Sequence, residues 1–107
     1  MGELVLRGGR VIDPSQNLDG TADVVFADGR VKAVGRDAAH GRDAEVRDAK
    51  GLIVTPGLID LHTHVYWGGT SLGVDAPALA RRSGTTTFVD AGSSGPGNFL
   101  GFRRHVI

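Results

Sequence analysis

The first half of the chain consists of short runs in which apolar and polar residues alternate, as in β-strands that bury one face. The run ELVLRG at residues 3–8 places Leu4 and Leu6 on one such face. Gly8 and Gly9 end this run, and paired glycines favour turns. We therefore expect the chain to turn there before a further strand, RVID.

A β-hairpin is predicted by the run DVVFADGRVKAVG at residues 23–35, where Asp28-Gly29 separates two β-rich arms. This dipeptide is typical of a type I′ turn, because both of its residues tolerate a positive φ. The run EVRDAKGLIVTPG then predicts one or two more strands with a turn at Lys50-Gly51. We predict a small antiparallel β unit over residues 1–55.

The pattern changes at Pro56-Gly57. The run LIDLH is almost continuously apolar, which suits a strand of a parallel sheet that is covered on both faces. The run DAPALARRSG predicts a helix that begins after the N-cap Asp75 and ends before Gly84. The order strand and then helix is the first half of a repeating parallel β-α unit.

A second strand and helix follow in TTTFVDAG and NFLGFRRHVI. Asn98 is the expected cap of the last helix, with Phe99, Phe102 and Val106 on one side. The chain stops at Ile107 inside an apolar helical pattern, so we expect it to be the N-terminal piece of a larger protein. The alternative is a short domain that ends on a frayed helix.

Composition excludes several classes of partner. The 107 residues contain 12 Lys plus Arg and 12 Asp plus Glu, so we expect neither nucleic-acid binding nor attachment to an anionic membrane. The sequence has no cysteine, secretory signal or long apolar run, which fits a cytoplasmic protein.

The main candidate for chemistry is the histidine pair His62 and His64 at the end of the apolar run LIDLH. Residues i and i+2 of a strand share a face, so both imidazoles can reach one ion, at roughly 2.0–2.1 Å for zinc. The alternative is a pair of structural histidines with satisfied hydrogen bonds. Asp60 shares their face, and it either orients a ligand or a nearby backbone group, or is an ordinary acid at a strand end.

Three further residues are candidates for a substrate pocket. Tyr66 and Trp67 directly follow the histidine pair, and Asp90 ends the second predicted strand. The alternative roles are packing for the two aromatic residues and an ordinary strand-end acid for Asp90. The loop GSSGPG at residues 92–97 lacks the lysine of a phosphate-binding P-loop, so we interpret it as a simple connection.

The segment GLIVTPGLIDLHTHVYWGG resembles the first barrel strand of the amidohydrolase superfamily, whose signature is a strand that ends in H-x-H. The runs VIDP and DVVFADGRVKAVG match the N-terminal β unit of that family in order and spacing, and VDAGSSGPGNFLGFRRHVI is most similar to its dihydroorotase-like and deacetylase branch. The resemblance covers nearly all of the chain but only the start of the family's fold, because a (β/α)8 barrel alone needs about 250 residues.

The resemblance implies an α/β fold with an all-β N-terminal unit. Residues 1–55 would be part of a small β-sandwich, and residues 56–107 the first two βα units of a (β/α)8 TIM-type barrel. It implies one or two divalent ions, usually zinc, with His62 and His64 as ligands. The remaining ligands and the catalytic acid have no counterpart among these residues, so no catalytic residue is expected in the segment.

The resemblance also implies a function. We expect the N-terminal part of a metal-dependent hydrolase that cleaves the C–N bond of a cyclic amide or N-acyl compound, or an acyl ester, and that is inactive as the segment alone. Dihydroorotases carry an arginine where this chain has Tyr66, which argues against orotate-type substrates. A small-molecule substrate and a full-length homo-oligomer are expected. The alternatives are a non-catalytic scaffold of the same fold and a small β/α interaction module.

Overall fold

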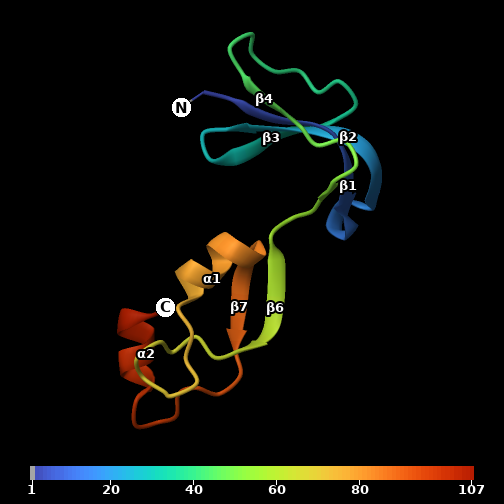
Figure 1. The fold of residues 1–107 in the computed structure, drawn as a ribbon. Coiled ribbons are helices and arrows are strands. Elements are labelled where there is room, and N and C mark those ends of the chain that lie inside the picture. Colours follow the sequence, from blue (N-terminus) through green and yellow to red (C-terminus); the bar gives the residue numbers. More distant parts are fainter. Residues whose placement is uncertain (1) are drawn as a thin grey trace. The chain divides into compact units, whose positions relative to one another are not determined.

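A computed structural model describes residues 2–107, which divide into two compact units on either side of the Pro56–Gly57 bond. The first unit is a five-stranded sheet and the second combines two strands with two helices (Figure 1). No helix among residues 2–107 is long and apolar enough to cross a membrane.

The sheet of the first unit has the strand order β3-β2-β1-β4, with β5 paired to β1 beyond this path. Antiparallel pairs join β1 to β2 and β2 to β3, whereas β4 and β5 run parallel to β1. Its strands are β1 (Leu4–Asp13), β2 (Leu18–Ala27), β3 (Arg30–Gly35), β4 (Glu45–Asp48) and β5 (Ile53–Val54).

The prediction of an antiparallel unit is therefore wrong for β4 and β5. A parallel pair needs a connection that carries the chain back to the starting end of its partner. Residues 36–44 provide this connection between β3 and β4, and their polar composition gave no sign of the direction in which the chain would return.

The predicted turn at Gly8 and Gly9 is also wrong, because β1 continues through both residues as one strand. Gly8 has a φ of 72°, and the pairing of β1 with β2 shifts register between Leu6 and Gly9. The glycines therefore form a β-bulge rather than a turn. A Cβ at Gly9 would lie 2.8 Å from a methyl of Val54, so the close approach of β5 also requires a glycine here.

The predicted hairpin is confirmed. Ala27 pairs with Arg30 across the turn, and both central residues have positive φ values, 50° at Asp28 and 72° at Gly29. This is the geometry that a type I′ turn requires. Strands β1 and β2 are joined not by a two-residue turn but by a 3-10 helix, η1 (Pro14–Gln16). Asn17 ends this helix in the left-handed region.

The apolar interior of the first unit lies on β1 and β2. Val5 and Val25 are directly paired and fully buried. A second buried cluster is formed by Val11, Ala22 and Val24, against which Leu6, Leu18, Phe26 and Val54 pack. This sheet is thus stabilised by burial on both strands that occupy its centre.

The second unit follows the predicted order of strand, helix, strand and helix (Figure 1). Strands β6 (Leu58–Thr63) and β7 (Thr85–Asp90) form a parallel pair, and helix α1 (Ala76–Ser83) connects them. The Asp75 carboxylate accepts the N–H of Ala78, and Gly84 ends the helix in the left-handed region, as expected. Helix α2 (Phe99–His105) comes last.

Two expectations for this unit are not met. Asn98 is the N-cap residue of α2, as expected, but its side chain makes no capping hydrogen bond, because its side-chain oxygen accepts the N–H of Gly95 in the preceding loop at 2.8 Å. Strand β6 is not covered on either face by the described residues, since the adjacent residues Leu58 and Ile59, which face opposite ways, are 52% and 62% exposed. A parallel strand of this composition requires further layers, and residues 2–107 do not provide them.

Candidate functional site

The histidine pair lies at the carboxyl end of β6. His62 belongs to the strand and His64 follows its last residue, Thr63, which faces the other way and is buried. The two ring centroids are 5.7 Å apart, with their planes at 78°. Imidazoles that bind one tetrahedral zinc through nitrogen have centroids roughly 5 Å apart, so the separation of this pair is close to the one that a shared ion requires.

Asp60 contacts the backbone rather than a ring. Its carboxylate accepts the N–H of His62 at 3.1 Å. This bond lies within the strand and constrains the backbone at the first histidine. Asp60 thus touches a backbone group of the pair, one of the two contacts that its position in the sequence suggested.

At the end of β7, the Asp90 carboxylate accepts hydrogen bonds from three backbone N–H groups. Its carboxylate accepts from Ser93 at 2.6 Å, from Val65 at 2.9 Å and from Gly92 at 3.0 Å. Burial acts to raise the pKa of this carboxyl, but the hydrogen bonds from Ser93, Val65 and Gly92 together outweigh it and lower the pKa below its ordinary value. Asp90 is therefore an ionised acceptor that ties the β7 loop to the residue after His64.

Ser93 is a neighbour of the pair that the sequence did not single out. Its hydroxyl oxygen lies 2.9 Å from Nδ1 of His64. The loop that carries Ser93 was interpreted as a simple connection, and it does connect β7 to α2. The available signal was the spacing in Asp90-Ala-Gly-Ser93, because an aspartate commonly binds backbone N–H groups two or three residues later.

The two aromatic residues after the pair differ in their surroundings. The Tyr66 ring packs against Phe102 of α2 with centroids 4.9 Å apart, and its hydroxyl donates to the carbonyl of Asn98 at 3.3 Å. Trp67 is 66% exposed. Tyr66 thus takes part in packing within the unit, whereas the Trp67 ring is free to contact a ligand.

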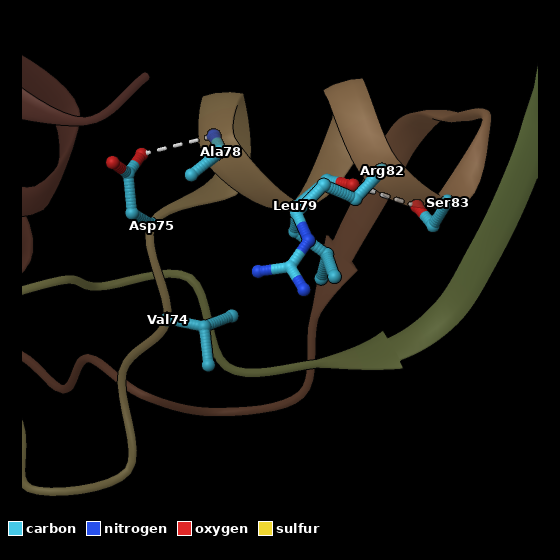
Figure 2. A pocket seen from close by; sticks show the side chains of 6 residues that line it. All are labelled: Val74, Asp75, Ala78, Leu79, Arg82 and Ser83. Carbon is cyan, nitrogen blue, oxygen red and sulfur yellow. Dashed lines mark hydrogen bonds between the residues drawn. The ribbon is translucent and has the colours of Figure 1, made fainter.

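A hollow lies beside α1, and none of the site residues described above lines it. It is lined by Val74, Asp75, Ala78, Leu79, Arg82 and Ser83. Figure 2 shows that Asp75 is engaged in capping the helix and that the hydroxyl of Ser83 is turned to the carbonyl of Leu79. No sequence-predicted site residue lines this hollow.

The donor set near His62 and His64 fits a divalent transition metal only in part. Two neutral imidazoles are suitable ligands for zinc. Among residues 2–107, however, no group of three or more histidine, aspartate or glutamate side chains is arranged to hold a metal ion. The described residues therefore bring together two candidate ligands, whereas a catalytic zinc site takes three from the protein.

Comparison with known proteins gives a consistent result. Residues 45–94 match the model of the amidohydrolase family. A deacetylase of Brucella anthropi is 39% identical over 93 residues, and a dihydroorotase of Geotalea daltonii is 55% identical over 62 residues. A crystal structure of a dihydroorotase superposes with a TM-score of 0.79 at 29% identity and covers 100% of this chain.

The matches extend over only part of each relative. They cover 86% of this chain and 23% of the Brucella deacetylase, 58% of this chain and 15% of the Geotalea dihydroorotase, and 28% of the dihydroorotase structure. The agreement of a family model, two relatives and a superposition over all residues identifies the segment. The chain belongs to the amidohydrolase superfamily and spans less than a quarter of the curated relatives that it matches here.

Proposed function

We propose that this chain is part of a metal-dependent hydrolase that cleaves the C–N bond of a cyclic amide or an N-acyl compound. The observation that carries the proposal is the histidine pair at the carboxyl end of β6, with ring centroids 5.7 Å apart. His62 and His64 are two of the ligands of a divalent ion, which we take to be zinc. The family match over residues 45–94 supports this assignment.

In this proposal, β6 and β7 are the first two strands of a (β/α)8 barrel, and the sheet of residues 1–55 is part of a β-sandwich. Residues 56–107 would then hold the start of the barrel. The parallel pairing of β6 with β7 through α1 is the repeat from which such barrels are built. Active sites of these barrels lie at the carboxyl ends of the strands, which is where the two histidines lie.

Bound metal would supply a water of lowered pKa and would polarise the scissile carbonyl. The residues of this chain have supporting roles. His62 and His64 hold the ion, Asp60 constrains the backbone of the first ligand, and Asp90 and Ser93 secure the loop beside the second. The remaining ligands and the acid that moves the proton would come from residues outside this chain, so the segment alone is expected to be inactive.

The proposed substrate is a cyclic amide or an N-acyl compound without an essential carboxylate at the position of Tyr66. Dihydroorotases place an arginine there, whereas the uncharged Tyr66 ring packs against Phe102. A substrate carboxylate would therefore have no cationic side chain to bind at position 66. The names of the relatives, deacetylase and dihydroorotase, agree with C–N bond hydrolysis, and an acyl ester remains within the same chemistry.

Three coarser expectations belong to the same proposal. We expect a small-molecule substrate, a cytoplasmic location and a homo-oligomeric whole protein. The absence of cysteine from the sequence agrees with a reducing compartment. Asp90, Tyr66 and Trp67 are proposed to border the substrate pocket, and among them the 66% exposed Trp67 has the most surface to offer a ligand.

A chimera would test this function. The matching segment of the Brucella anthropi deacetylase is replaced by this chain, and metal content and hydrolysis of that enzyme's own substrate are measured. The chimera is expected to hold metal and to be active. The His62→Ala and His64→Ala chimeras should lose most of both, while His40→Ala should retain them. Retention of metal and activity without His62 and His64 would refute the assignment.

A further inference from the structure

His64 lies just beyond the part of β6 that the sheet holds in place. The strand ends at Thr63, and the pairing of Thr63 with Asp90 is the last one between β6 and β7. The backbone of His64 therefore depends on hydrogen bonds outside this ladder. Its imidazole lies beside that of His62 only if these bonds fix the direction in which the chain leaves the strand.

The end of β7 holds the residues on either side of His64. The N–H of Ala91 donates to the carbonyl of Thr63 at 2.8 Å. The Asp90 carboxylate accepts the N–H of Val65 at 2.9 Å. Both bonds act on the neighbours of the histidine, and its own carbonyl is held by a different segment.

The carbonyl of His64 is held by the connection between β6 and α1, where Val74 donates its N–H at 2.8 Å. Val74 directly precedes Asp75, the N-cap residue of α1, so this bond also joins the histidine to the start of that helix. It closes residues 65–73 into a loop whose two ends lie side by side. The backbone of this loop must therefore pass close to itself.

The loop closes in this way because residue 73 is a glycine. A Cβ at Gly73 would lie 2.4 Å from the carbonyl oxygen of Tyr66, 2.7 Å from its carbonyl carbon and 3.0 Å from the nitrogen of Trp67. All three are backbone atoms, so a side chain fits only if two stretches of the loop move apart. Gly73 does not have a positive φ, so this close approach alone requires a glycine. Gly69 differs, because its would-be Cβ meets the side-chain ring of Tyr66.

We propose that Gly73 is a positioning residue for His64. By letting the loop pass close to the backbone of Tyr66, it brings Val74 to the His64 carbonyl and so holds the second imidazole beside the first. The role in metal binding rests on the proposed function, whereas the protection of the Val74 N–H by His64 does not. His62 needs no such support, because it lies within β6.

Amide hydrogen exchange of the metal-free chain, followed by NMR at neutral pH, tests the structural part. The Val74 N–H should exchange slowly in the unsubstituted chain. Gly73→Ala should accelerate its exchange about 10-fold, as expected for the loss of one hydrogen bond. Gly97→Ala adds a Cβ with no atom within 4 Å and should leave the exchange unchanged. Rapid exchange at Val74 in the unsubstituted chain would overturn the inference, and this reading requires no variant to fold.

Titration with Zn2+ at a pH of about 7.5 tests the consequence for metal. Gly73→Ala should weaken binding about 10-fold, as loss of a group that orients a ligand commonly does. Gly97→Ala should retain the affinity. Gly69→Ala should retain it as well, because its Cβ displaces the ring of Tyr66 and leaves the path of the loop unchanged.

The two glycine variants at positions 69 and 73 separate positioning from stability. Circular dichroism first establishes that each variant is folded under the conditions of the titration, so that unfolding does not contribute to the difference. Full Zn2+ affinity in Gly73→Ala, or equal weakening by Gly69→Ala, would overturn the inference. A slowly exchanging Val74 N–H in a chain that binds no Zn2+ would support the structural part and contradict the proposed function instead.

Discussion

The carboxylate of Asp90 accepts the backbone N–H of Val65 at 2.9 Å and so joins the end of β7 to the residue that follows His64. Val65 is buried, and the same carboxylate also accepts from Gly92 and Ser93. One side chain thereby fixes the relative positions of two loops that both leave carboxyl ends of parallel strands. We regard Asp90 as the residue that organises this end of the second unit.

Substitution Asp90→Asn should destabilise the second unit. An amide has one oxygen to accept hydrogen bonds, and its NH2 group would face N–H donors that the carboxylate now satisfies. The expected loss in the free energy of unfolding is about 1–2 kcal/mol, measured by urea denaturation at neutral pH. Asp43→Asn, at an exposed carboxyl, is the matched control, and an equal stability of the two variants would contradict this role of Asp90.

Because the Tyr66 ring packs closely against Gly69, substitution of this glycine should destabilise the second unit. A Cβ at Gly69 would lie 2.3 Å from a carbon of the Tyr66 ring, so Gly69→Ala must displace the ring from Phe102. We expect a loss of roughly 1–3 kcal/mol in stability and a weaker near-ultraviolet circular dichroism signal. Gly95→Ala meets no atom within 4 Å and should leave both nearly unchanged. Similar values for the two variants would show that the stacked arrangement does not persist in solution.

The pH dependence of the first unit should reflect Glu3. A hydrogen bond from Lys32, followed by one from the N–H of Gly41, lowers the pKa of Glu3 from its ordinary value of 4.5. Because the folded pKa is depressed, the stabilisation is complete above the unfolded pKa and is lost as the pH falls through the folded one. Thermal unfolding between pH 6 and 3 should show this loss, and Glu3→Gln should flatten the curve. A variant that retains the full slope would exclude Glu3 as its source.

The hairpin between β2 and β3 offers a test of backbone conformation. Gly29 has a φ of 72° and open space around a would-be Cβ, so Gly29→Ala is penalised only by its conformation. We expect a loss of about 1–2 kcal/mol in the free energy of unfolding. Asparagine tolerates this region, so Gly29→Asn should cost less. Equal losses for alanine and asparagine would argue against the type I′ geometry.

Local signals in the sequence predicted much of the fold. The Asp28-Gly29 turn, the Asp75 cap and the Gly84 end of α1 each depend on a few adjacent residues, and the structure confirms them. Predictions that depended on distant partners were less successful. Gly8 and Gly9 have the composition of a turn, but β2 and β5 lie beside them and continue the strand as a bulge.

In the candidate site, too, the features set by adjacent residues were predictable and those set by distant residues were not. The spacing of His62 and His64 was sufficient to place both at the end of one strand. The contact of His64 with Ser93 joins residues 29 positions apart, and no periodicity in the sequence encodes it. Asn98 has the composition of a capping residue, as Asp75 does, but its side-chain oxygen accepts the N–H of Gly95 instead of an N–H of the helix.

Calorimetric titration of the purified chain with Zn2+ at a pH of about 7.5 tests the central claim most directly. His62→Ala and His64→Ala remove the proposed ligands, and His40→Ala and His105→Ala remove histidines elsewhere in the chain. We predict that the unsubstituted chain and both controls bind Zn2+, and that loss of either His62 or His64 abolishes or strongly weakens binding. Equal binding by all five proteins would contradict the assignment of the pair as metal ligands.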